Sequence, residues 1–301
     1  MDRIVFGDNQ FFGINHMSEE KAQSQAEHFK DNAAIIDVID AAYSCGIHTF
    51  MFSTHERVAG LCNYFRAHPD KYAGLKLCPS IPYAYKYANA VNEKGILGAI
   101  DQFVFSGQGA SKAIRTIVRS GITMINQDMI EVMKLLVDAD MRMFEGLDVQ
   151  AVFLQNTVTD ILLGLRVKEV FIEYASHIHR MYGVDPAFNT MNMPDLVDFL
   201  LDCGIENPIV CSSINKAGFA MNPSRQAYEE CLADRRFRPM AMSIFASGAI
   251  RPREAVEYVC GLPNIRSVVF GASSRGHIEQ TKDLICSCWG QMETLEAATR
   301  T

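Results

Sequence analysis

The sequence predicts a closed (β/α)8 TIM barrel that forms a single domain over residues 1–301, on three observations. Short apolar or β-branched segments recur along the chain, and each is followed by a stretch with helical spacing. The length suits one barrel, since barrels commonly take about 250 residues or more as one unit. Hydrophobic residues make up 49% of the chain and charged residues 21%, which provides enough apolar material for a large core.

Eight segments have the character of buried strands. They are residues 3–7, 47–53, 74–80, 149–155, 186–190, 208–213, 239–245 and 266–271. Apolar side chains at intervals of three and four residues, such as Ile35, Val38 and Ile39, predict helices between these segments. Gly46 and Gly204 follow two of the predicted helices, at the place where a left-handed residue ends a helix without strain.

One connection is too long for a simple strand–helix unit. Residues 81–148 separate the third and fourth predicted strands, and they carry helical patterns at about 109–120 and 127–144. We therefore expect a helical insertion over the barrel mouth in this region.

Composition and charge exclude several classes of protein. The net charge is −7 and there is no basic run, so nucleic acid is not an expected partner. No stretch approaches the length of about 18 apolar residues that crosses a membrane, and the N-terminus does not resemble a secretory signal. Nine scattered cysteines indicate a cytoplasmic protein without a metal site. The expected partner is a small-molecule substrate, and the sequence leaves the oligomeric state open.

Three parts of the chain resemble aldo-keto reductases. Residues 48–54, after Gly46-Ile47, are similar to the family's F-D-T-A segment, and residues 243–250 are similar to its strand-seven pattern P-L-x-x-G-x-L. Residues 267–280 resemble the last strand and phosphate-binding turn, V-I-x-G-A-x-S-x-x-H-x-x-E. The resemblance implies an oxidoreductase that uses NADP on a small polar carbonyl or sugar-like substrate. It also implies cofactor contacts from six residues: Ser247, Gly248, Gly271, Ser273, Ser274 and Arg275.

The chain departs from this family at the residues that carry its chemistry. The family's tetrad is Asp, Tyr, Lys and His, but Ser53 stands in place of the Asp and Gln155 in place of the His. No Tyr occurs near residues 58–60, and the third strand ends without a Lys. Carbonyl reduction in its usual form therefore lacks its general acid. Ser273 and Ser274 can also be explained as the cap of a helix.

Residues that directly follow barrel strands form the active site in such folds, which makes Asp8, His55 and Lys216 the catalytic candidates. Asp8 suits a general base or a ligand for a sugar hydroxyl, and it also suits a turn residue. His55 suits an acid or base near neutral pH, and it also suits an ordinary loop histidine. Lys216 suits a Schiff-base nucleophile, or else a solvated lysine that caps a strand or binds an anionic substrate.

Uncharged polar residues lie at the exits of several of the other strands. We expect Asn9, Gln155, Asn189 and Asn215 to bind a polyhydroxylated or carboxylated substrate. Three functions remain open at this point. They are an aldo-keto-reductase-like enzyme, a lyase or isomerase that uses Lys216 or His55 without nicotinamide, and a non-catalytic ligand-binding barrel. We favour an enzyme, because this end of the barrel gathers Asp, His, Asn and Lys side chains.

Overall fold

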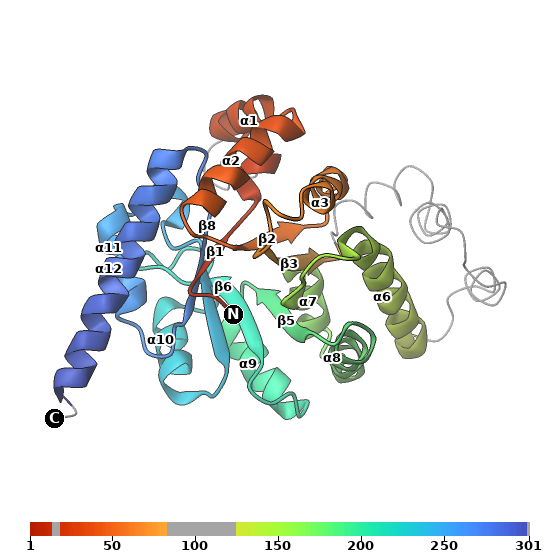
Figure 1. The fold of residues 1–301 in the computed structure, drawn as a ribbon. Coiled ribbons are helices and arrows are strands. Elements are labelled where there is room, and N and C mark those ends of the chain that lie inside the picture. Colours follow the sequence, from red (N-terminus) through yellow and green to blue (C-terminus); the bar gives the residue numbers. More distant parts are fainter. Residues whose placement is uncertain (14–18, 83–124, 300–301) are drawn as a thin grey trace.

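The barrel predicted from the sequence is present in the computed structural model, which describes residues 1–13, 19–82 and 125–299. Eight parallel strands close in chain order, so that β1 pairs with both β2 and β8 (Figure 1). The strands are β1 Ile4–Phe6, β2 Thr49–Ser53, β3 Lys76–Ile81, β4 Ala151–Leu154, β5 Asp185–Thr190, β6 Ile209–Ser213, β7 Arg238–Met242 and β8 Ser267–Phe270. Each of them overlaps one of the eight predicted segments.

The end of β7 differs from its prediction by three residues. The predicted strand runs to residue 245, whereas β7 ends at Met242. The next residue, Ser243, has a φ of +53°, and a left-handed residue cannot continue a strand. The backbone therefore turns immediately at this exit.

Helices surround the strands on the outside of the barrel (Figure 1). They are α1 Glu19–His28, α2 Asn32–Ser44, α3 Val58–Ala67, α6 Ile125–Met141, α7 Asn156–Gly164, α8 Lys168–Tyr182, α9 Met193–Asp202, α10 Arg225–Asp234, α11 Pro252–Cys260 and α12 Arg275–Thr299. Short 3-10 turns η1 Asn9–Phe12, η2 Arg142–Phe144 and η3 Ala246–Gly248 also occur. Gly46 and Gly204 have φ values of +85° and +76° just past α2 and α9, as predicted.

Helix α6 coincides with the predicted helix at 127–144 of the long connection. It packs against α8, and its side chains Met133, Val137 and Met141 are buried in the same cluster as the barrel's outer core. Apolar burial of this kind holds α6 in the ring of helices. The predicted helix at 109–120 lies outside the described residues, so an insertion over the mouth remains a prediction for that part.

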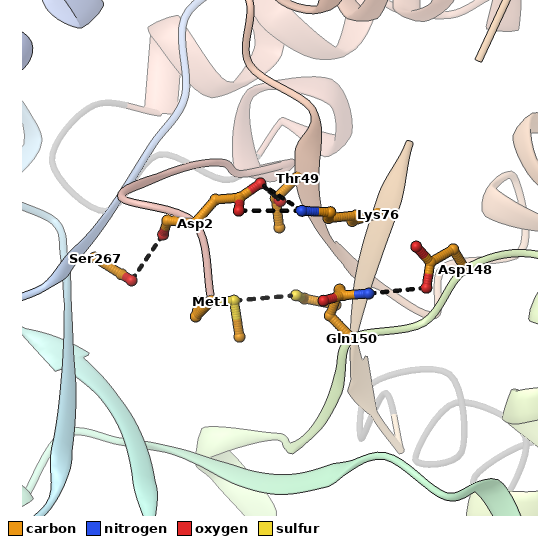
Figure 2. A network of polar contacts seen from close by, with 8 residues as sticks. Met1, Asp2, Thr49, Lys76, Asp148, Gln150 and Ser267 are labelled. Carbon is orange, nitrogen blue, oxygen red and sulfur yellow. Dashed lines mark hydrogen bonds and ion pairs between the residues drawn. The ribbon is translucent and has the colours of Figure 1, made fainter. Parts of the chain in front are cut away.

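The amino-terminal end of the barrel is closed by the first residues of the chain (Figure 2). The Asp2 carboxylate accepts hydrogen bonds from Thr49 Oγ1 at 2.6 Å and Lys76 Nζ at 3.2 Å. The Ser267 hydroxyl donates to the Asp2 carbonyl at 2.8 Å, and Met1 Sδ lies 3.7 Å from Cys78 Sγ. This end of a barrel contributes stability, which leaves the opposite end for the functional site.

Candidate functional site

Polar side chains line the inside of the barrel at the carboxyl ends of the strands. Successive strand residues point to opposite faces, so the residue two positions beyond each interior residue also faces inward. The interior cluster includes Val5, Met51, Cys78, Phe153, Ala187, Cys211, Met240 and Val269. The next inward positions form what we call the exit layer: Gly7, Ser53, Ser80, Gln155, Asn189, Ser213, Met242 and Gly271.

A hydrogen bond across the barrel supports the exit layer. Asn189 Nδ2 on β5 donates to Ser80 Oγ on β3 at 2.8 Å, although β4 lies between these strands in the sheet. Asn189 is 6% exposed, and its Oδ1 is buried without a hydrogen-bond partner. Since leaving a buried acceptor unpaired costs about 1–3 kcal/mol, this oxygen is a ready acceptor for a donor on a ligand.

Asp8 contacts the exit layer through Ser53. Its Oδ2 accepts a hydrogen bond from the backbone N–H of Ser53 at 2.7 Å, and Asp8 is only 5% exposed. Burial raises the pKa of the carboxyl to about 7, although hydrogen bonds from Ser53 oppose this shift. Asp8 precedes η1 without capping it through its side chain, so its carboxyl joins β1 to β2 rather than ordering a turn.

His55 lies just beyond β2 and its ring is fixed on two sides. The ring stacks on Phe12, with centroids 4.4 Å apart and an interplanar angle of 15°. His55 Nδ1 accepts a hydrogen bond from the backbone N–H of Arg57 at 3.3 Å. In the neutral ring, an accepting Nδ1 places the proton on Nε2.

The Lys216 amine is exposed, and it forms an ion pair with Glu254 at 2.6 Å. A Schiff-base lysine needs a desolvated amine, and this position does not provide one. The neighbouring Asn215 is fully buried, and its side-chain amide exchanges two hydrogen bonds with the backbone of Phe219, both at 2.9 Å. Asn215 therefore shapes the loop after β6.

Gln155 and Asn9 occupy different environments at this end of the barrel. Gln155 is 6% exposed, directly precedes α7, and donates its backbone N–H to the carbonyl of Ile81 at 2.9 Å. Asn9 is exposed at the start of η1. Of these two amides, only Gln155 belongs to the exit layer.

The residues that the resemblance assigns to a cofactor lie after β7 and β8. Ser247 and Gly248 form η3, with φ values of +56° and +94°. Ser274 Oγ accepts from the backbone N–H of His277 at 3.4 Å, which makes it a cap of α12, and Ser273 stands just before it. Arg275 donates to Glu279 at 2.8 Å and to Ser44 at 3.1 Å, so its guanidinium already has protein partners.

Gln10 covers the glycine at the β8 exit. An ideal Cβ on Gly271 would lie 2.0 Å from Gln10 Oε1, so the glycine leaves room for this amide in its present position. Gln10 Nε2 donates to the carbonyl of Gly7 at 2.9 Å, which fixes the amide in that place. Gln10 therefore lies against Gly271 and Arg275 is already paired, and the assignment of these residues to a cofactor stays a prediction.

The described residues contain no cluster of His, Cys, Asp and Glu that could hold a metal ion. All nine cysteines are unpaired thiols, and burial raises the pKa of Cys78 to about 12, which excludes a thiolate nucleophile at β3 near neutral pH. Within the described part of the chain, no helix has both the length and the apolar character needed to span a membrane.

Several residues of the site were missed by the sequence analysis. Ser80, Ser213 and Phe12 were not proposed as site residues, although the two serines lie at strand ends and Phe12 lies in η1 after β1. Counting alternate positions outward from the interior residues would have found the two serines. The stacking of Phe12 has no comparable signal in the sequence.

No family model and no curated protein matches this sequence. Solved structures do match in fold. Two structures from Pseudomonas aeruginosa, described as a "putative aldo-keto reductase", align with a TM-score of 0.54 and 11% identity over 95% of this chain. The alignments cover 90% and 89% of those chains.

An aldo-keto reductase from Brucella melitensis aligns with a TM-score of 0.47 and 11% identity, covering 84% of this chain and 83% of that one. That third similarity is too low to support an argument. The first two show that the described chain shares its barrel fold with those structures. Fold similarity by itself does not identify a reaction.

Proposed function

We propose that this protein is a barrel enzyme that transfers a proton to or from a small carbonyl or sugar-like substrate at the exit layer. Asp8 is its general acid or base. The observation that carries this proposal is the buried Asp8 carboxyl held against Ser53, the position where the related family has its catalytic Asp. The carboxyl therefore comes from β1 in this chain and reaches the same exit from the neighbouring strand.

The environment of Asp8 suits proton transfer near neutral pH. A general acid or base works best when its pKa lies close to the operating pH, because both protonation states are then populated. Burial brings the pKa of Asp8 to about 7. A neutral carboxylic acid can donate a proton to a carbonyl oxygen, which is the role left empty by the missing Tyr and Lys.

His55 is the second proton carrier in this proposal. Its Nδ1 is occupied by the Arg57 N–H, and stacking on Phe12 fixes the ring plane. In the neutral ring the proton is then on Nε2. An acid and a base at neighbouring strand exits suit a reaction that moves a proton between two positions of one substrate.

Hydroxyl and amide groups of the exit layer bind the substrate in this proposal. Asn189 Oδ1 accepts from a substrate hydroxyl, while Ser80, Ser213 and Gln155 supply further donors and acceptors. A small molecule is therefore the expected partner. The nine unpaired thiols fit a reducing cytoplasm as the place of action.

An NADP-dependent oxidoreductase is the second candidate, and the similarity of the fold to aldo-keto reductases favours it. NADP, when bound, would supply hydride chemistry. For side-chain contacts from Arg275 to the cofactor phosphate, its guanidinium would exchange Glu279 for the phosphate. We do not adopt a Schiff-base reaction at Lys216, because its amine is exposed and paired with Glu254.

Proton exchange and cofactor binding are measured separately to test these proposals. The wild-type protein and Asp8→Asn are incubated in deuterium oxide with a panel of aldoses, ketoses and α-hydroxy carbonyl compounds, and deuterium incorporation into each compound is followed by NMR. Lys216→Gln is the control, because it removes an exposed charge outside the exit layer. In parallel, NADPH and NADH are titrated while nicotinamide fluorescence and thermal stability are recorded.

Exchange by the wild type and by Lys216→Gln is expected, with a loss of about 100-fold or more in Asp8→Asn, the usual size of a general acid–base contribution. Equal exchange by Asp8→Asn would overturn the role of Asp8. Saturable binding of either dinucleotide favours the oxidoreductase, and at about 100 times its Kd a ligand stabilises by about 2.7 kcal/mol.

A further inference from the structure

Arg57 follows the carboxyl end of β2. Its guanidinium is held in place by one hydrogen bond, and one of its nitrogens has no acceptor. Its Nε donates to Asn32 Oδ1 at 3.0 Å, and Asn32 Nδ2 donates back to the Arg57 carbonyl at 3.4 Å. Its Nη2 is buried and has no hydrogen-bond partner. The edge of the guanidinium that carries Nη2 is therefore positioned without a protein acceptor.

The support for this guanidinium is specific to its place in the fold. A Cβ on Gly60 would lie 2.6 Å from Asn32 Nδ2, so the glycine leaves the space that Asn32 occupies. Asn32 is the first residue of α2 and is 25 positions away from Arg57 in the sequence. The backbone N–H of Arg57 is fixed as well, because it donates to His55.

Arg57 differs in burial and in charge pairing from six exposed arginines of the described chain. Several exposed arginines each form an ion pair with a carboxylate: Arg166, Arg225, Arg235, Arg238, Arg253 and Arg275. Arg57 is half-buried, and among the described residues no carboxylate forms an ion pair with it. A partly desolvated cation without a counterion is costly, and a bound anion offsets that cost.

We propose that Arg57 is an anion-binding residue, which holds a carboxylate or phosphate group of the ligand against its Nη edge. Arginine favours these groups because its planar N–H donors match two oxygens of one oxyanion. Because its backbone N–H is bonded to His55, Arg57 stands beside one of the two proposed proton carriers. The inference deepens the proposed function by giving the substrate a negative charge, but the binding is measured without turnover.

Isothermal titration calorimetry with sodium phosphate and, separately, sodium malonate tests this assignment at ionic strength matched with sodium chloride. The proteins are the wild type, Arg57→Gln, Arg57→Lys, Asn32→Ala, Arg275→Gln and Asp8→Asn. Arg275→Gln is the matched control, because that arginine also follows a strand but is already paired with Glu279. It reports on any phosphate bound at the β8 exit.

We expect saturable binding of at least one anion by the wild type, and the stronger of the two identifies the group as phosphate or carboxylate. Arg57→Gln is expected to weaken this binding at least tenfold, and Arg57→Lys and Asn32→Ala to weaken it less. Arg275→Gln and Asp8→Asn should bind like the wild type. Proton exchange by Asp8→Asn at the wild-type rate would refute the proposed function. Unchanged anion binding by the same variant would leave this inference standing.

The inference is overturned if the wild type binds neither anion, or if Arg57→Gln binds as tightly as the wild type. Should Arg57→Gln fail to fold, as judged by circular dichroism, the decision passes to the other two variants. Unchanged affinity in both Arg57→Lys and Asn32→Ala would then overturn it.

Discussion

Two features of the Asp8 environment have opposite effects on the pKa of its carboxyl. Burial disfavours its charge, whereas the Ser53 N–H at 2.7 Å favours it. Burial is the larger effect, and the pKa of Asp8 rises to about 7. A single carboxyl can therefore be an acid on one side of neutrality and a base on the other.

This balance predicts the pH dependence of activity. The rate of the exchange reaction should follow a titration close to pH 7 in the wild type, because the required form of Asp8 is gained or lost there. The measurement is kcat/KM from pH 5 to 9 with the best compound of the panel. An inflection near pH 7 that is present in the wild type and in Asp8→Glu, together with a loss of activity in Asp8→Asn, supports the assignment. A flat wild-type profile contradicts it.

Substitution of Asn189 should affect substrate binding more than the free energy of unfolding. Asn189→Ala removes the hydrogen bond to Ser80 at 2.8 Å, but it also removes a buried acceptor that has no partner. The two effects oppose each other, so the free energy of unfolding should change by less than about 1.5 kcal/mol. The KM for a hydroxylated substrate should rise about tenfold, since one hydrogen bond to the substrate is lost.

Urea unfolding and steady-state kinetics measure these two quantities. Ser213→Ala is a comparison for stability alone, because among the described residues that hydroxyl hydrogen-bonds only to Met191 Sδ, at 3.6 Å. A large loss of stability in Asn189→Ala with an unchanged KM would mean that Asn189 serves the barrel rather than the substrate.

At the scale of elements, α6 is tied both to the ring of helices and to the site. Asp138 on α6 accepts from Tyr182 on α8 and lies 2.7 Å from His177 Nε2. Asp140, two residues further along α6, accepts a hydrogen bond from Thr54 Oγ1 at 2.5 Å, and both Asp140 and Thr54 are fully buried. Thr54 directly precedes His55. The contact from α6 to Thr54 therefore helps to fix the backbone next to the second proton carrier.

Thr54→Val tests this link between α6 and β2. The substitution keeps the shape of the side chain but removes a hydroxyl that donates to a buried carboxylate, which costs about 1–3 kcal/mol. We expect that loss in urea unfolding, together with a lower kcat. Thr54→Ser retains the hydroxyl and should recover most of the stability. Equal stability of the Val variant and the wild type would show that this contact contributes nothing measurable.

For the molecule as a whole, two carboxyls at opposite ends of the barrel make stability depend on pH in opposite directions. The pKa of Asp8 is raised to about 7, so its folded state binds a proton more tightly than the unfolded state does. The resulting stability is full below about pH 4 and is lost as pH rises towards 7. Burial opposes ionisation of Asp2 at the other end, but hydrogen bonds from Thr49 and Lys76 lower its pKa. Its contribution to stability is therefore present above about pH 4 and is lost as the pH falls below that value.

Asp8→Asn should remove the loss of stability between about pH 4 and 7. The full effect is on the order of 4 kcal/mol, because each pKa unit corresponds to about 1.4 kcal/mol. Urea unfolding at several pH values measures it, and Asp2→Asn is the comparison, with its change confined to lower pH. Parallel curves for wild type and Asp8→Asn across this range would mean that Asp8 titrates normally in the folded protein.

The fold could be predicted from local patterns because each barrel strand is buried on both faces and is therefore a short apolar run. Those runs also determined which residues follow a strand, and so brought Asp8, His55 and Asn189 to the correct end of the barrel. What the sequence could not determine is how these side chains are partnered. Pairing depends on the neighbours that barrel closure supplies.

Tertiary structure alone decided the environment of each candidate. Asn189 meets Ser80 across 109 positions of sequence, Lys216 meets Glu254 across 38, and Arg57 meets Asn32 across 25. The first contact leaves an acceptor unpaired, the second neutralises an exposed amine, and the third orients a cation that has no counterion. Chemical reactivity depends on burial and on nearby charge, and both are set by residues that are close in space but distant along the chain.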